Sequence, residues 1–137
     1  MPYEVIEHTA DAGIAVTAAT LPELLAEAAR GMYSLIVDVE EVRPAERRDL
    51  EVTAATDEKR LLAWLLELLF LTETEGLVFS RFDVRVEGDV VRGSAWGEPL
   101  DEPRHHPSGL IKGVTRHGLE VSQTESGAYR ARIIFDM

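Results

Sequence analysis

The hydrophobic and polar positions along this chain follow two different periods, which predict two helices among several strands. From Leu21 to Ile36 apolar side chains recur every three or four residues, which is the spacing of one buried helix face. Thr20-Leu21-Pro22-Glu23 begins this stretch with the Thr-x-x-Glu pattern of a capping box, and proline is tolerated in a first turn. The pattern predicts a first helix that begins after Thr20 and ends near Asp38.

A second helix is predicted from Glu58 to about Thr74, with Asp57 as its N-cap and Gly76 as its C-terminal stop. Its apolar residues cover nearly the whole circumference: Leu61, Leu62, Leu65, Leu66, Leu68, Leu69 and Phe70. This pattern is typical of a buried helix, so we expect the second helix to be deeply packed and to carry no chemistry.

The remaining apolar runs are short and are bounded by turn residues, which is the pattern of β-strands. Strands are expected at these positions: 3–7, 13–18, 51–55, 78–86, 90–96, 110–115, 119–124 and 129–135. Gly88-Asp89 and Gly118 mark expected turns, and residues 99–107 form a polar loop with three prolines. The whole pattern predicts an α+β layered sandwich, with a mostly antiparallel sheet and two main helices packed on it, in one domain over residues 1–137.

Charge and composition narrow the classes of function. The formal net charge of -11 argues against tight RNA or DNA binding by this chain alone, because phosphate contacts need a basic surface. The same charge suits a basic protein partner, and it equally suits plain solubility. The chain has no cysteine, no apparent signal peptide and no apolar run long enough to span a membrane. We therefore expect a cytoplasmic protein.

The most specific chemistry lies in Glu7-His8-Thr9-Ala10-Asp11-Ala12-Gly13 and in the last residues, Phe135-Asp136-Met137. Asp11 and Asp136 stand where strands are expected to end, and carboxylates with backbone carbonyls are the ligands that hard divalent cations prefer. Met137 follows Asp136 directly, so its carbonyl and carboxylate can reach the same ion. The alternative is that Asp11 only stabilises a turn, where aspartate is common.

An ordered set of motifs gives the chain a resemblance to a known family. The His-Thr-Ala-Asp-x-Gly motif of residues 8–13 is followed by these segments: 64–71 (WLLELLFL), 74–82 (TEGLVFSRF), 97–101 (GEPLD), His105, 112–117 (KGVTRH) and 134–136 (IFD). Each motif is short, but their order from Tyr3 to Met137 resembles the archease family, the accessory proteins of RtcB-type, GTP-dependent RNA ligases. Arg116 stands where an aromatic residue is expected, and Met137 also departs from the family pattern.

The resemblance implies a function and a site. Archeases assist guanylylation of the active-site histidine of the ligase and allow its repeated turnover in tRNA splicing or RNA repair, without being catalytic themselves. They bind a metal through the aspartate that matches Asp11 and through the C-terminal residues, here Asp136 and Met137. The expected cofactor is a divalent metal ion, with Ca²⁺ as the bound ion and Mn²⁺ as the alternative in function. The expected partner is an RtcB-type RNA ligase, and the oligomeric state stays open.

Three more residues are candidates around that site. His8 can ligate a softer metal or orient Asp11 by a hydrogen bond, and we favour the second role. Asp38, at the expected end of the first helix, opposes the helix dipole, and the resemblance puts an acidic residue near the metal there; a solvated helix end is the alternative. Lys112, expected in a strand, is a candidate through the resemblance, whereas a lysine that only extends into solvent is the alternative.

Two other interpretations use the same ionisable residues. His8, His105, His106 and His117 suggest zinc, but without cysteine or tight ligand spacing, and we expect His105 and His106 to be solvated. The alternative function is a small metal-dependent hydrolase that uses Asp11, Asp136 and His8. Such an enzyme needs a substrate cleft and a general base beside the metal, and the sequence shows no such constellation.

Overall fold

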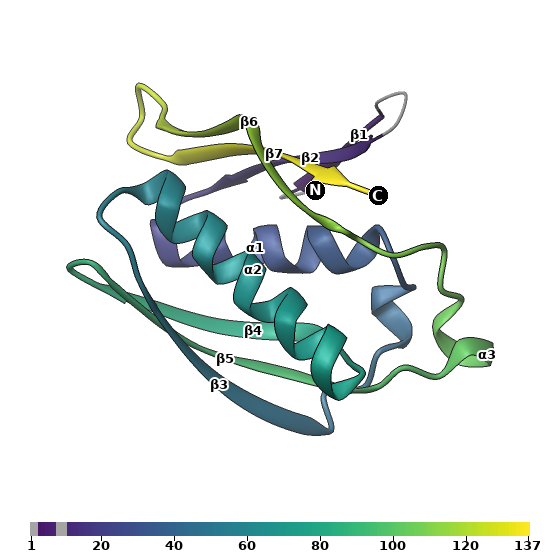
Figure 1. Ribbon diagram of the computed structural model, residues 1–137. Helices are drawn as coiled ribbons and strands as arrows, with labels where there is room; N and C mark the ends of the chain where they lie inside the picture. The colour runs from purple at the N-terminus through teal and green to yellow at the C-terminus, as the bar shows by residue number, and fades with distance from the viewer. Residues whose placement is uncertain (1–2, 8–10) are drawn as a thin grey trace.

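Two antiparallel sheets enclose two helices in the computed structural model, which describes residues 3–7 and 11–137, with Glu7, Asp11 and His117 described by their backbone only (Figure 1). One sheet has the strand order β1-β2-β7-β6, with β1 at Tyr3–Glu7, β2 at Asp11–Ala18, β7 at Tyr129–Asp136 and β6 at Gly113–Gln123. The other has the order β3-β5-β4, with β3 at Glu46–Thr53, β5 at Val90–Pro99 and β4 at Leu77–Glu87. The helices between them are α1 at Leu21–Ser34 and α2 at Asp57–Glu75, and two short turns of helix are η1 at Val39–Glu41 and α3 at Glu102–His105. This arrangement confirms the predicted fold class, although the strands form two sheets where one was expected.

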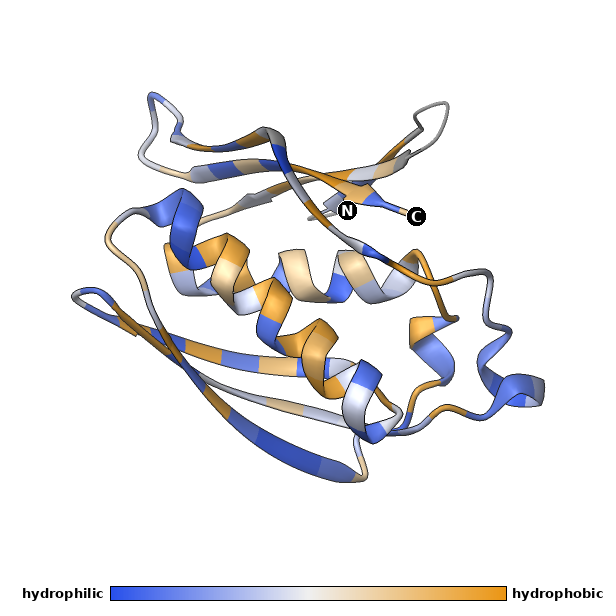
Figure 2. Ribbon diagram, viewed as in Figure 1, coloured by the Kyte–Doolittle hydropathy of each residue, from blue (hydrophilic) through white to orange (hydrophobic). Residues whose placement is uncertain are grey.

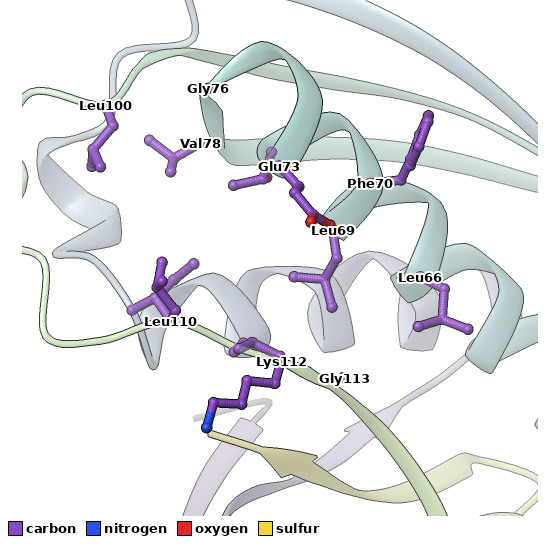
Figure 3. Close-up of a pocket in the computed structure, with 13 residues that line it drawn as sticks. Leu66, Leu69, Phe70, Glu73, Gly76, Val78, Leu100, Leu110, Lys112 and Gly113 are labelled. Carbon is purple, nitrogen blue, oxygen red and sulfur yellow. The ribbon is translucent and has the colours of Figure 1, made fainter.

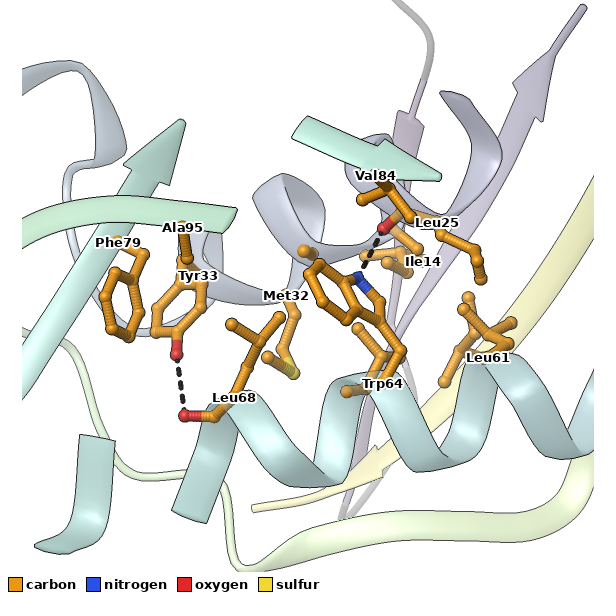
Figure 4. Packing of buried hydrophobic residues seen from close by; sticks show 14 of the residues in the cluster. Ile14, Leu25, Met32, Tyr33, Leu61, Trp64, Leu68, Phe79, Val84 and Ala95 are labelled. Carbon is orange, nitrogen blue, oxygen red and sulfur yellow. Dashed lines mark hydrogen bonds between the residues drawn. The ribbon is translucent and has the colours of Figure 1, made fainter. Parts of the chain in front are cut away.

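The core lies where α1 and α2 face each other and the inner faces of the two sheets. Both helices lie between the two sheets and carry apolar stretches (Figure 2), and their buried residues include Leu24, Leu25, Leu61 and Leu65. The indole Nε1 of Trp64 donates to the Leu25 carbonyl at 3.0 Å, and the hydroxyl of Tyr33 donates to the Leu68 carbonyl at 3.1 Å (Figure 4). Because both polar side-chain atoms are paired, the two large aromatic residues can be buried without an unsatisfied donor, and they tie α1 to α2.

The second helix is buried on one side only, which corrects the expectation that it is deeply packed all round. Leu61, Trp64, Leu65 and Leu68 are buried, whereas Leu66 is 43% exposed and Phe70 is 56% exposed. The sheets and α1 cover a single face of α2, so a sequence that is apolar on every face leaves some leucines uncovered. The N-cap is Thr56 and not Asp57, because the Thr56 hydroxyl accepts the Lys59 N–H at 3.2 Å. In the described part of the chain, no helix has the length and apolarity needed to cross a membrane.

Truncation of Leu65 to alanine is expected to lower the free energy of unfolding by roughly 2–5 kcal/mol, because this side chain of α2 is fully buried in the core. The matched control is Leu66→Ala on the next position of the same helix, which should cost about 1 kcal/mol or less, since Leu66 is already half in solvent. Urea denaturation followed by circular dichroism measures both. Equal losses for the two variants would show that α2 presents a different face to the core.

The bounds of β3 and β6 differ from the predicted strands. β3 begins at Glu46, five residues before the predicted strand 51–55, and in it Leu50 is buried while Arg47 and Asp49 are exposed on the opposite face. The predicted strands 110–115 and 119–124 are instead one strand, β6, which pairs with β7 on both sides of an irregularity. Gly118, the expected turn, has a φ of +84° within that irregularity. The chain therefore bulges at Gly118 without reversing direction.

Candidate functional site

The register of the four-stranded sheet places Asp11 and Asp136 opposite each other. β2 begins at Asp11, β7 ends at Asp136, and these two residues are direct partners in the antiparallel pairing. Directly opposite positions in such a pair lie on the same face of the sheet with Cβ atoms about 4.5–5.5 Å apart. Two acidic positions from the two ends of the chain are thus neighbours, and their oxygens are the donor type that suits a hard divalent cation.

A third strand, β6, begins beside Asp136 at the same end of the sheet. Gly113, the first residue of β6, is the partner of Asp136 on its other side, and the Lys112 N–H donates to the Asp136 carbonyl at 2.7 Å. The sequence predicted Lys112 inside a strand, but it lies just before β6. Its side chain is exposed. Its candidate role remains a prediction, but the structure brings it next to Asp136.

Of the other predicted members of this site, the structure describes Met137 but not His8. Met137 is half-buried and packs against the core. His8 lies outside the described residues, so its predicted role stays a prediction. Among the side chains that the structure describes, no three histidine, aspartate or glutamate residues gather as a metal-binding group.

Asp38 does not close the first helix, which corrects the argument from the helix dipole. α1 ends at Ser34, and Asp38 instead precedes η1 without capping it. The reason is tertiary: the Ile36 carbonyl accepts the Ser108 N–H at 2.9 Å, and the Asp38 N–H donates to the His105 carbonyl at 2.7 Å. Distant backbone groups thus replace the partners that a longer helix would provide.

The Asp38 carboxylate is exposed and faces a histidine. The Nδ1 atom of His106 lies 4.0 Å from Asp38 Oδ2, and the imidazole itself is exposed. No described contact joins Asp38 directly to Asp136. The described neighbour of the Asp38 carboxylate is thus His106, and its predicted place in the metal site stays a prediction.

A buried ionic cluster around Glu98 is the main feature that sequence reasoning missed. His105 is fully buried and not solvated, because its Nε2 lies 2.9 Å from Glu98 Oε2. Its Nδ1 accepts the Asp101 N–H at 2.9 Å, so the ring proton is on Nε2 and is donated to Glu98. Arg104 donates to Glu98 Oε1 at 2.6 Å, and the Arg43 N–H donates to Oε2 at 2.7 Å. The signal was present in the sequence, since Glu98 and His105 both belong to the motifs that carried the resemblance.

Burial alone would raise the pKa of Glu98, but hydrogen bonds from the Arg43 N–H, His105 and Arg104 outweigh it and lower the pKa from its ordinary value of 4.5 to about 2. A carboxyl group with a lowered pKa in the folded state stabilises the fold above its unfolded pKa, and this contribution is lost as the pH falls.

We therefore expect the stability of the wild-type protein to fall between pH 4.5 and about 2, partly through Glu98. Urea midpoints measured across this range should decline more steeply for the wild type than for Glu98→Gln, which cannot titrate. Parallel pH profiles for the two proteins would show that Glu98 is not strongly held as a carboxylate.

The positions of His105 and His106 argue against a shared zinc site for these two residues. His105 is committed to Glu98, and His106 faces Asp38. These two imidazoles are thus engaged with different carboxylates.

An apolar groove of about 750 Å³ borders the candidate metal positions. Its exposed apolar residues come from α2 and from the chain before β6: Leu66, Phe70, Leu100 and Leu110. Lys112 and Gly113 form its edge, and Figure 3 shows the Lys112 amine directed toward the end of β7, away from the leucines. The groove and the Asp136 end of β7 therefore share one side of the molecule.

Comparison with known proteins gives a consistent set of similarities. A family model described as the archease protein family (MTH1598/TM1083) matches residues 3–137. The protein archease of Methanopyrus kandleri is 40% identical over 141 residues, which cover 100% of both chains. The protein archease of Thermococcus gammatolerans is 36% identical, with 98% of each chain covered.

Two solved structures are also similar. The solution structure of protein 1598 from Methanobacterium thermoautotrophicum matches with a TM-score of 0.87 at 34% identity and covers 99% of each chain. The crystal structure of an archease from Thermotoga maritima, described as a possible chaperone, matches with a TM-score of 0.64. That match covers 98% of this chain and 96% of the other, and at 21% identity it supports the fold alone.

Proposed function

Because this chain belongs to the archease family, we propose that it is an accessory protein of an RtcB-type, GTP-dependent RNA ligase and holds a divalent cation at Asp11 and Asp136. The observation that carries the proposal is the register of β2 and β7, which makes these two aspartates direct partners. The carbonyl of Met137 completes the proposed donor set, and Ca²⁺ and Mn²⁺ both suit oxygen ligands of this kind. A cytoplasmic location is part of the same proposal.

The ligase would carry GTP and RNA, while this chain would supply groups beside the phosphates. Asp11 and Asp136 would hold the cation there, and its charge would stabilise the negative charge that develops as GMP is loaded onto the ligase histidine. Lys112 would add a phosphate contact, since its exposed side chain lies next to Asp136. The chain itself would remain non-catalytic.

The surface suits a protein partner. A net charge of -11 favours encounter with a basic surface, as an RNA-binding ligase must have. The groove beside Lys112 exposes large apolar side chains, and apolar patches of this kind are typical of protein contact sites.

The direct test is ligation by the cognate RtcB-type ligase with limiting Mn²⁺. Sub-stoichiometric amounts of this protein should convert single-turnover ligation into multiple turnover. An unchanged turnover number with the wild-type protein would reject the accessory function. The same preparation should show no phosphatase or nuclease activity with Mn²⁺ alone, and robust hydrolysis would favour the metal-dependent hydrolase instead.

A further inference from the structure

The buried Glu98 cluster is attached to a stretch of chain that bonds to the backbone of two candidate residues, Asp38 and Asp136. Residues 105–112, called the connecting segment here, begin at His105, whose carbonyl accepts the Asp38 N–H at 2.7 Å. They end at Lys112, whose N–H donates to the Asp136 carbonyl at 2.7 Å. Between them, Ser108 donates from its N–H and its hydroxyl to the carbonyls of Ile36 and Leu35, at 2.9 and 3.0 Å. One segment therefore bonds to the backbone of two candidate aspartates.

The connecting segment is irregular in structure. After His105 it contains no helix or strand, and Leu110 within it is 78% exposed. His106 adopts a φ of +50° as the left-handed C-cap of α3, and its N–H donates to the Glu102 carbonyl at 3.1 Å. The residue directly before it is His105, whose side chain is locked to Glu98 in the interior.

We propose that Glu98, Arg104 and His105 are positioning residues, which hold the connecting segment and through it the backbone of Asp38 and Asp136. Glu98 uses both oxygens for this purpose: Oε1 accepts from Arg104, and Oε2 accepts from His105 and from the Arg43 N–H. The arrangement joins β5 to α3 and to the chain before β3 at one buried carboxylate. The proposal rests on the proposed function in so far as Asp136 serves there.

The experiment compares three variants of the full chain. His105→Leu fills the site with an apolar side chain and removes both hydrogen bonds of the imidazole. His105→Gln keeps one donor and one acceptor on a flexible side chain. Tyr33→Phe removes a different buried hydrogen bond, between α1 and α2, that does not touch the connecting segment.

Two quantities are measured for each variant: amide hydrogen exchange at Asp38 and Lys112 by NMR, and Mn²⁺ affinity by calorimetry. We expect His105→Leu to lose the protection of the Asp38 amide and to bind Mn²⁺ about 10–100-fold more weakly, the usual loss when groups that orient metal ligands are removed. His105→Gln should restore much of both properties. Tyr33→Phe should lower the thermal midpoint while leaving both unchanged.

The inference is overturned if His105→Leu keeps wild-type amide protection at Asp38 and wild-type Mn²⁺ affinity. It is also overturned if Tyr33→Phe weakens Mn²⁺ binding as much as His105→Leu, because the cluster would then act through overall stability alone. If the wild-type protein binds no Mn²⁺, the proposed metal site fails, and the exchange rates at Asp38 and Lys112 still decide whether the cluster holds the segment. If His105→Leu does not fold, Glu98→Gln takes its place under the same criteria.

Discussion

Replacing Asp136 with alanine is expected to abolish detectable Mn²⁺ and Ca²⁺ binding and to return the cognate ligase to its unstimulated turnover. Asp136 is the direct partner of Asp11 at the end of β7, so its removal leaves one acidic position where two are proposed to share a cation. A single carboxylate is a weak ligand for a hard divalent ion, which needs several oxygens. Calorimetry with each metal and multiple-turnover ligation measure the two effects, and Asp11→Ala should behave in the same way.

The matched control for this variant is Asp83→Ala. Asp83 is an exposed acidic residue of β4 in the other sheet, so its removal changes the net charge equally without touching the site. The strand should survive in Asp136→Ala, because Asp136 bonds to Lys112 through its backbone carbonyl. Metal affinity in Asp136→Ala equal to that of the wild type would remove Asp136 from the site, and a comparable loss in Asp83→Ala would point to general electrostatics.

Substitution of Gly97 by alanine is expected to have the largest effect on stability, roughly 4 kcal/mol or more, because the added methyl group has no space. A Cβ at this position would overlap the Val78 carbonyl oxygen and would lie 2.7 Å from the Val78 carbonyl carbon and 2.8 Å from the Phe79 Cα. All these atoms belong to the backbone of β4, so relief requires the two strands to separate. Urea or thermal unfolding followed by circular dichroism measures the loss.

Gly88→Ala is the control for this prediction. Gly88 has a φ of +61° in the turn between β4 and β5, and nothing lies within 4 Å of an added Cβ. Only backbone strain should appear there, about 1–2 kcal/mol. If Gly97→Ala were as stable as Gly88→Ala, the close approach of β5 to β4 would be wrong.

Local chemistry in the sequence determined where most elements begin and end. Thr20 caps α1 by accepting the Glu23 N–H, as the capping box predicts, and Gly76 ends α2 in the left-handed conformation. Gly88 forms the turn of the β4–β5 hairpin as predicted. These features depend on residues a few positions apart, so a single sequence contains the information that specifies them.

The sequence predicted the candidate site only in part. The residue types at Asp11 and Asp136 indicated a cation, and the resemblance indicated that they act together. Their proximity is a matter of register between β2 and β7, strands from opposite ends of the chain, and periodicity within one strand does not specify its partner. Asp38 shows the same limit, because its N–H donates to the carbonyl of distant His105, and the Ile36 carbonyl accepts from distant Ser108.

Burial was decided by the tertiary structure alone. Leu65 and Leu66 are identical residues at adjacent positions, yet one is fully buried and the other is 43% exposed, because the sheets cover only one face of α2. His105 lies in a polar, proline-rich loop, and its sequence surroundings predict solvent. It is buried because Glu98 on β5, Arg104 and the Arg43 backbone provide the charge and hydrogen bonds that make an interior imidazole and carboxylate stable. The amino-acid pattern thus determined the elements and the type of chemistry, and only the packing of distant segments decided which polar groups are buried together.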